Sequence, residues 1–254
     1  EDGDFKDGDQ LIKKQVQRFR IYAFDDQDRV IGEITADQGA ITWTVRVANT
    51  KAAWYGFNNP LDEGEIAPGL PGQKRNPYFV SDEEREAMLV IDGGPTQIAG
   101  ARTNRDGGED QYAMGGVFYG REPVGLGHLR TDEAGRLLVF PPDGVSNSPV
   151  NAAITSFADN DGWHDDWCDG PVSAVVDIPG LGAIEADQAW VACVGPNFAP
   201  EIAPVSTLYD VIQDMNVRAG WAERPSPVYF RRDIYPTFQR LGLMKWLTEA
   251  ALLR

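Results

Sequence analysis

The sequence has few of the residues that carry metal or nucleophilic chemistry. Its 254 residues include two cysteines, Cys168 and Cys193, and two histidines, His128 and His164. Two cysteines cannot build a disulfide framework, and both one bridge and two buried thiols remain open. The sequence also lacks a G-x-S-x-G elbow, a phosphate-binding loop, a dinucleotide fingerprint and zinc-ribbon spacing. These absences exclude the enzyme classes that such motifs define.

Basic residues are scarce relative to acidic ones. The chain carries 23 Lys and Arg against 39 Asp and Glu, a net charge of −16, and no isolated acidic tail. Nucleic acids and anionic membranes need a basic surface, so we expect neither as a partner. No run approaches the roughly 18 apolar residues of a membrane span. We expect a soluble protein, either cytoplasmic or secreted.

Neither end of the sequence has the signals of a natural terminus. The first ten residues contain no methionine and no hydrophobic signal core. The last residues, LTEAALLR, favour a helix and are followed by neither Gly nor Pro. We expect a longer polypeptide that was cut at both ends.

Alternating apolar residues predict strands over most of the chain. In 15–24, Phe19, Ile21 and Ala23 share one face, and a turn at 25–28 leads to a return strand at 30–34. The clearest alternation is at 41–49. Further strands are predicted at 87–91, 127–130, 137–140, 173–178 and 189–194, with a hairpin turn at 132–135.

The pattern changes to helical spacing near residue 206. Apolar residues recur at Leu208, Val211, Ile212, Met215 and Ala219, with Ser206 as the expected N-cap and Gly220 as the stop. A second helix is predicted at 232–254. Strands before helices favour an α+β chain. We predict a mainly antiparallel, sandwich-like β domain at 1–204, then a helical segment at 205–254.

The run GWHDDWCDGPV at 162–172 concentrates the polar chemistry of the chain. Its carboxylates and two just upstream could supply oxygen ligands to Ca²⁺ or Mg²⁺. The candidate ligands are Asp159, Asp161, Asp165, Asp166 and Asp169. No EF-hand register with its terminal Glu follows, and zinc would need a second His or a Cys pair at ligand spacing.

A structural interpretation of the same run is favoured over a metal site. Carboxylates before Gly-Pro commonly cap backbone amides, while tryptophans pack beneath the loop. The residues of this predicted rigid loop are Trp163, His164, Asp166, Trp167, Asp169, Gly170 and Pro171, with 169–171 as a turn. A Cys168–His164 nucleophile pair is disfavoured, because i, i+4 spacing brings two side chains together only on a helix.

Several stretches in order resemble one family. They are FKDGDQLIKKQVQRFRIYAFD (5–25), VRVANTKAAWYGFNNP (45–60), KRNP (74–77), LGHLRTDEAGRLLVFPPDGVS (126–146), FADNDGWHDDWCDGPVSA (157–174), AWVACVGPNFAP (189–200) and RRDIYPTFQRL (231–241). Together they resemble the N-terminal region of the LodA-like quinoprotein amino-acid oxidases, a family typified by L-lysine ε-oxidase and glycine oxidase.

The resemblance implies an enzyme activity for the parent protein. Members of this family carry cysteine tryptophylquinone, a cofactor made from a Cys and a Trp of the same chain. They oxidise a primary amine of an amino acid with O₂ and release ammonia and hydrogen peroxide. The cross-linked pair lies in the larger C-terminal part of these proteins. We therefore expect no cofactor in this chain and catalytic residues outside it.

The resemblance also implies partners. They are the C-terminal catalytic region of the same protein and an amino-acid substrate of undetermined identity, with a homo-oligomer as a further option. A terminal apolar stripe of Phe238, Leu241, Leu247 and Leu252 is expected to pack against that C-terminal region. Two alternatives stay open: a non-catalytic structural or interaction domain, and a Ca²⁺- or Mg²⁺-binding β module centred on 159–169.

Overall fold

A computed structural model describes residues 6–54, 56, 73–155, 159–195 and 204–243. The chain divides into two compact units. One consists of residues 14–195, and the other combines residues 1–13 with 196–254. The predicted domain boundary after residue 204 rests on the change in residue pattern and stays a prediction.

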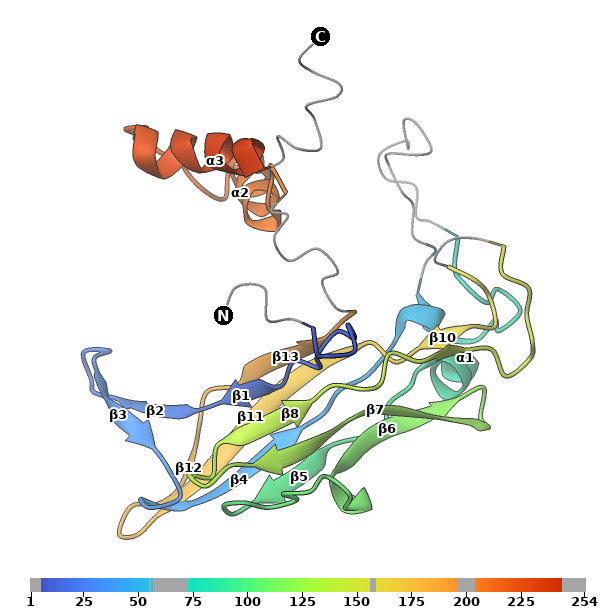
Figure 1. Ribbon diagram of the computed structural model, residues 1–254, viewed down its shortest axis with the longest axis horizontal. Coiled ribbons are helices and arrows are strands. Elements are labelled where there is room, and N and C mark those ends of the chain that lie inside the picture. The colour runs from blue at the N-terminus through green and yellow to red at the C-terminus, as the bar shows by residue number, and fades with distance from the viewer. Residues whose placement is uncertain (1–5, 55, 57–72, 156–158, 196–203, 244–254) are drawn as a thin grey trace. The chain divides into compact units, whose positions relative to one another are not determined.

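The larger unit contains a five-stranded antiparallel sheet in the order β12–β11–β4–β5, with β13 also paired to β11. Its strands are β4 (Ala40–Val45), β5 (Thr96–Ala99), β11 (Cys168–Ile178), β12 (Gly182–Glu185) and β13 (Ala189–Cys193). The long strand β11 is therefore the centre of this sheet. It pairs with β4 along one edge and with β12 and β13 along the other (Figure 1).

A second antiparallel sheet has the order β1–β8–β7–β6. Its strands are β1 (Gln17–Phe19), β6 (Ala113–Phe118), β7 (Glu122–Thr131) and β8 (Leu137–Phe140). Two short antiparallel pairs accompany the sheets: β2 (Ile21–Phe24) with β3 (Val30–Ile34), and β9 (Ser146–Asn147) with β10 (His164–Asp165). The predicted mainly antiparallel β fold is confirmed.

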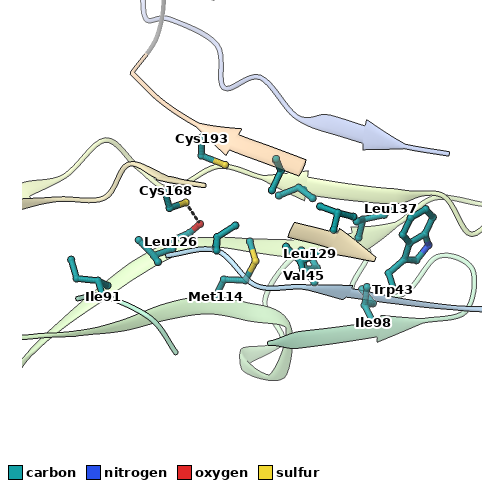
Figure 2. Close-up of a cluster of buried hydrophobic side chains, with 14 of the residues drawn as sticks. Trp43, Val45, Ile91, Ile98, Met114, Leu126, Leu129, Leu137, Cys168 and Cys193 are labelled. Atoms are coloured by element: carbon teal, nitrogen blue, oxygen red, sulfur yellow. Dashed lines mark hydrogen bonds between the residues drawn. The ribbon is translucent and has the colours of Figure 1, made fainter. Parts of the chain in front are cut away.

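One buried cluster draws side chains from both sheets. Ile41, Trp43 and Val45 of β4 share it with Leu126 and Leu129 of β7 (Figure 2). Two hydrogen bonds cross between the sheets: the Trp43 indole donates to the Gly135 carbonyl at 2.9 Å, and the Cys168 thiol to the Leu126 carbonyl at 3.5 Å. Burying these apolar faces against each other is the main stabilising term of a sandwich.

The predicted alternation is confirmed where every second residue is apolar. Ile41, Trp43, Val45 and Val47 are all buried, and the intervening residues are more exposed. In 17–24 the alternation is weaker, since Phe19, Ile21 and Ala23 are half-buried and their neighbours are exposed. That segment is divided at Arg20 into β1 and β2, which pair with different strands. The turn at 132–135 joins β7 to β8 as predicted.

The predicted strand at 87–91 is wrong, because residues 82–89 form helix α1 (Asp82–Leu89). The Ser81 hydroxyl caps it by accepting from the Glu84 amide at 3.1 Å, and three acidic residues occupy its first turn. Negatively charged side chains in the first turn interact favourably with the positive end of the helix dipole. These capping signals outweigh the short apolar run at the end of the segment.

The predicted turn at 169–171 is also wrong, since all three residues lie within β11. A Cβ on Gly170 would lie 1.9 Å from the Arg46 carbonyl oxygen, so only glycine permits this close strand approach. Pro171, which has no amide hydrogen, accepts from the Arg46 amide at 3.2 Å beside the last residue of the β11–β4 ladder. Gly170 and Pro171 are therefore accommodated within β11 and do not end the strand.

The smaller unit is helical where it is described after residue 204. It contains α2 (Leu208–Arg218), a π-helical turn η3 (Phe230–Ile234) and α3 (Tyr235–Leu243). Thr207, not the predicted Ser206, caps α2 and forms a capping box with Asp210. The Arg240 guanidinium donates to Asp210 at 2.6 Å and ties α3 to α2. Two short 3₁₀ turns, η1 (Lys51–Ala53) and η2 (Asp110–Tyr112), lie in the larger unit.

Candidate functional site

The segment 159–167 leads into β11 and forms one wall of a cavity of about 1100 Å³. Residues 49–54, which include η1, and residues 144–146 supply the other walls, together with Arg75. β9 and β10 join two of these walls, since His164 pairs with Asn147 and Asp165 with Ser146. Three stretches distant in the sequence therefore meet at one place.

The buried Asn76 and Arg75 hold the first part of the segment 159–167 in place. The Asn76 side chain donates to the Ala52 carbonyl at 2.9 Å and accepts from the Gly162 amide at 2.6 Å. The Asp161 carboxylate in turn accepts from the Asn76 backbone amide at 2.6 Å. Arg75 donates to the Asn160 carbonyl at 2.8 Å. The two residues thus connect segments 52, 75–76 and 160–162.

Four of the five candidate metal ligands, Asp161, Asp165, Asp166 and Asp169, accept hydrogen bonds from different groups. Asp165 accepts from the Asn49 side chain at 2.8 Å and from the Trp167 amide at 3.0 Å, and it also pairs with Lys51. Asp169 accepts from the Trp190 indole at 2.9 Å. Asp159, Asp165 and Asp166 line the cavity. Across the residues that the structure describes, no group of three or more His, Cys, Asp or Glu is arranged to hold one metal ion.

Asp166 is the most buried of these carboxylates, with 2% of its surface exposed. One of its oxygens accepts from the Val145 amide at 2.7 Å, so it caps the opposite wall of the cavity. The contact is a backbone cap of the kind predicted for the loop. The capped amide, however, belongs to the distant segment 144–146 and not to the loop itself. Its other oxygen, Oδ1, has no hydrogen-bond partner among the described residues.

Two residues that line the cavity each carry a further buried polar atom without a hydrogen-bond partner within the described part of the chain. The two atoms are Nε of Arg75 and Nε2 of His164. The His164 ring packs against Phe118, with ring centroids 5.1 Å apart. Buried polar groups are normally paired, so these three atoms are exceptions, and all three belong to residues that line the cavity.

Two exposed tryptophans extend the cavity surface. Trp54 and Trp167 have 66% and 44% of their surface exposed, and the Lys51 ammonium lies 4.4 Å from the centre of the Trp167 ring. Trp163 is oriented differently, because its indole donates to the Ala152 carbonyl at 2.9 Å. The Cys168–His164 pair is not formed, since the Cys168 thiol donates to Leu126 instead.

Most residues of the site lie in the sequence stretches that resemble the family, but those stretches do not show which residues contact one another. Asn49, Lys51 and Trp54 belong to the stretch 45–60, and Arg75 and Asn76 to KRNP. No local pattern assigns them to the loop at 159–167, because their contacts span about 85 to 116 positions in sequence. Their shared resemblance to one family was the only available signal.

Comparison with known proteins identifies the family of the chain. Residues 1–193 match the family described as L-Lysine epsilon oxidase N-terminal. The chain is 31% identical, over 274 aligned positions, to L-lysine 6-oxidase from Marinomonas mediterranea. That alignment covers 96% of this chain and 37% of the relative, so the chain spans less than half of that protein.

Solved structures support the same family assignment. The ε-lysine oxidase of M. mediterranea matches with a TM-score of 0.68 and 32% identity, over 94% of this chain and 38% of that one. A structure of the Schiff base intermediate of the same L-Lys ε-oxidase with L-Lys matches with a TM-score of 0.68 and 31% identity, over 96% of this chain and 38% of that one. The chain belongs to the L-lysine ε-oxidase N-terminal family.

Proposed function

We propose that this chain is the N-terminal part of a cysteine tryptophylquinone-dependent L-amino-acid oxidase. The parent protein would oxidise a primary amine of an amino acid, reduce O₂ to hydrogen peroxide and release ammonia. The observation that carries this proposal is the match to L-lysine 6-oxidase over 96% of the chain. The proposed substrate class is an amino acid with a reactive primary amine, and lysine is the first compound to test.

A carbonyl cofactor agrees with what is described for the relative. A Schiff base with L-Lys has been captured in the M. mediterranea enzyme. A Schiff base forms between an amine and a carbonyl, and a quinone supplies such a carbonyl and also accepts electrons. This supports the quinone assignment for the parent protein.

The cysteines of this chain do not fit the cofactor. Cys168 and Cys193 face each other across β11 and β13. Trp43 is the one tryptophan in the buried cluster that they share, within the described residues, and it lies at the other end of that cluster (Figure 2). A Cys–Trp cross-link needs the two side chains in contact. We therefore assign the quinone to a part of the parent protein outside residues 1–254.

The proposed role of this chain is structural support and binding. The sandwich carries the cavity walls, and the cavity offers the exposed side chains of Trp54 and Trp167 to a partner. We propose the C-terminal catalytic region of the same protein as the partner of this chain.

The activity is tested with the longer protein that contains this chain. Incubation with L-lysine, glycine and other amino acids should release ammonia and hydrogen peroxide in equal amounts with at least one of them. A carbonyl reagent such as phenylhydrazine should abolish the release. If a folded, full-length protein releases peroxide with none of the amino acids, the oxidase assignment is contradicted and the non-catalytic alternative is supported.

A further inference from the structure

The two cysteines of the chain are direct cross-strand neighbours. Cys168 begins β11, Cys193 ends β13, and the two are partners in the antiparallel register. Both are buried, with 5% and 8% of their surface exposed, and neither is in a disulfide. Directly opposite residues project from the same face of a sheet, so both thiols point into the sandwich (Figure 2).

The backbone spacing at this pair suits a disulfide. Asp169 exchanges both of its backbone hydrogen bonds with Ala48, on the side of β11 away from β13. Backbone groups alternate along a strand, so those of Cys168 point toward β13 and the Cys168–Cys193 pair is of the hydrogen-bonded type. Such pairs have Cα atoms about 5.5 Å apart, which lies inside the range of about 4.4–6.8 Å that disulfides span.

The pKa values of the two thiols are shifted in opposite directions. Contact with Cys193, and then burial, raises the pKa of the Cys168 thiol. The neighbouring Cys168 thiol lowers the pKa of the Cys193 thiol. Cys193 is therefore the thiol that ionises first, and a thiolate is the nucleophilic form. Its position at the end of β13, before the exposed Val194, lets a small oxidant reach it when the strand end opens.

We propose that Cys168 and Cys193 are a dithiol site that hydrogen peroxide oxidises to a disulfide joining β11 to β13. The Cys193 thiolate attacks one peroxide oxygen, the O–O bond breaks, and Cys193 becomes a sulfenic acid while hydroxide leaves. The Cys168 sulfur then attacks the Cys193 sulfur, and the sulfenic oxygen leaves as water. Two thiols lose two electrons in total, and one peroxide is reduced to two waters.

The disulfide would close the segment from residue 168 to residue 193, which contains the β11–β12 hairpin and β13. A covalent link at the start of β11 prevents β13 from detaching. We expect the melting temperature to rise by about 5 °C or more, as the entropy of a loop of this size suggests. The inference rests on the two strands and not on the proposed oxidase activity, although that activity would generate the same oxidant.

The test counts thiols by mass spectrometry. The folded, reduced chain is treated with hydrogen peroxide, quenched with catalase, unfolded and alkylated with iodoacetamide. We expect the alkylated thiols to fall from two to none, the unlabelled mass to decrease by two hydrogens, and one peptide to link Cys168 to Cys193. Dithiothreitol should restore both labels. The same two peptides can be followed in the longer parent protein, whatever other cysteines it contains.

Single variants test the order of events. In Cys168→Ser, the remaining Cys193 should form a sulfenic acid that dimedone traps. In Cys193→Ser, trapping at Cys168 should be slower, because its thiol ionises less readily. Three results would overturn the proposal: two thiols that still alkylate after peroxide, over-oxidised cysteines without a cross-link, or disulfides only between molecules. The wild-type mass result decides alone if a variant fails to fold.

Discussion

Asp166 shows how one buried side chain stabilises the cavity. Its carboxylate accepts the Val145 amide at 2.7 Å, with only 2% of the residue exposed. Asp166→Ala leaves that amide without an acceptor in a buried place. We expect the free energy of unfolding to fall by about 1–2 kcal/mol, measured by urea denaturation. Asp169→Ala is the matched control and should change stability little, because its partner Trp190 is exposed.

The same variant separates the capped loop from a metal site. A capping carboxylate needs no metal, so neither chelator nor added Ca²⁺ or Mg²⁺ should shift the melting temperature of the wild-type chain. A ligand that binds only the folded state would raise that temperature with occupancy. If the chelator alone reproduces the loss seen in Asp166→Ala, the metal interpretation of 159–169 is correct instead.

His128 makes the stability of the sandwich depend on pH. Burial, and then the charge of Arg130, lower the pKa of His128. Arg130 also donates to the ring nitrogen Nε2 at 3.0 Å, which requires that nitrogen to be unprotonated. The unfolded chain therefore binds the proton more readily. This contribution to stability is complete above the ordinary histidine pKa of about 6.5 and is lost as the pH falls toward the folded-state pKa.

The prediction is checked by comparing wild type with His128→Gln. Denaturation at about pH 7.5 and about pH 5.5 should show a larger loss for the wild type than for the variant. The difference between the two proteins removes the contribution of other groups that titrate in this range. Equal losses in both proteins would contradict the assignment to His128.

At the scale of elements, helix α1 fixes two walls of the cavity through Arg85. This residue is 4% exposed, and its guanidinium donates to the carbonyls of Ala53, Arg75, Asn76 and Phe79 at 2.8–3.0 Å. Arg85→Met would leave several buried carbonyls unpaired. We expect a loss of at least about 3 kcal/mol by urea denaturation.

Glu83→Gln, on the exposed side of the same helix, provides the control. A surface substitution of this kind should change the free energy of unfolding by no more than about 0.5 kcal/mol. If the two variants were equally stable, the carbonyl contacts of Arg85 would contribute nothing to holding the loops.

The elements also show what the sequence can predict. Strand β4 was predictable because its alternating Ile, Trp and Val leave no competing helical pattern. Strand β6 was missed, since Gly115 and Gly116 look like turn residues. The structure explains them: a Cβ on Gly116 would lie 2.6 Å from the Asp92 amide nitrogen. Glycine is used there for close backbone approach, which depends on tertiary packing.

The candidate site was predictable only in part for a similar reason. The segment 159–169 was identified from its unusual composition, and Asp166 does act as a cap. Its partners Asn49, Arg75 and Asn76 come from distant parts of the chain. Such contacts arise from the pairing of the strands, and no spacing rule within one segment reveals them.

At the scale of the whole molecule, the smaller unit leaves many apolar side chains exposed. Leu208, Val211, Phe230, Phe238 and Leu241 each have 46–75% of their surface exposed. Of the predicted terminal stripe, Leu247 and Leu252 lie outside the described residues. Large apolar side chains exposed in such number favour an interface, and we propose the C-terminal catalytic region as its partner.

The isolated chain should therefore self-associate. Light scattering should give a mass that rises above that of one 27.9 kDa chain as the concentration increases. Replacing Phe238 and Leu241 with Glu should reduce the association, whereas Thr237→Glu on the same helix should not. A concentration-independent monomer would contradict the assigned interface.

Across the described helices, none is long and apolar enough to cross a membrane. The chain contains a β sandwich and short helices, and the relative of known activity is considerably longer than this chain. We propose that the sandwich, its cavity and its two cysteines are one part of a larger oxidase.

Peptide-resolved mass spectrometry of the longer parent protein is the best test of the oxidase assignment. We predict a Cys–Trp cross-link with two added oxygens in peptides outside residues 1–254. Peptides containing Cys168 and Cys193 should carry no tryptophan cross-link. A protein without any Cys–Trp cross-link, or with one at Cys168 or Cys193, would contradict the proposal.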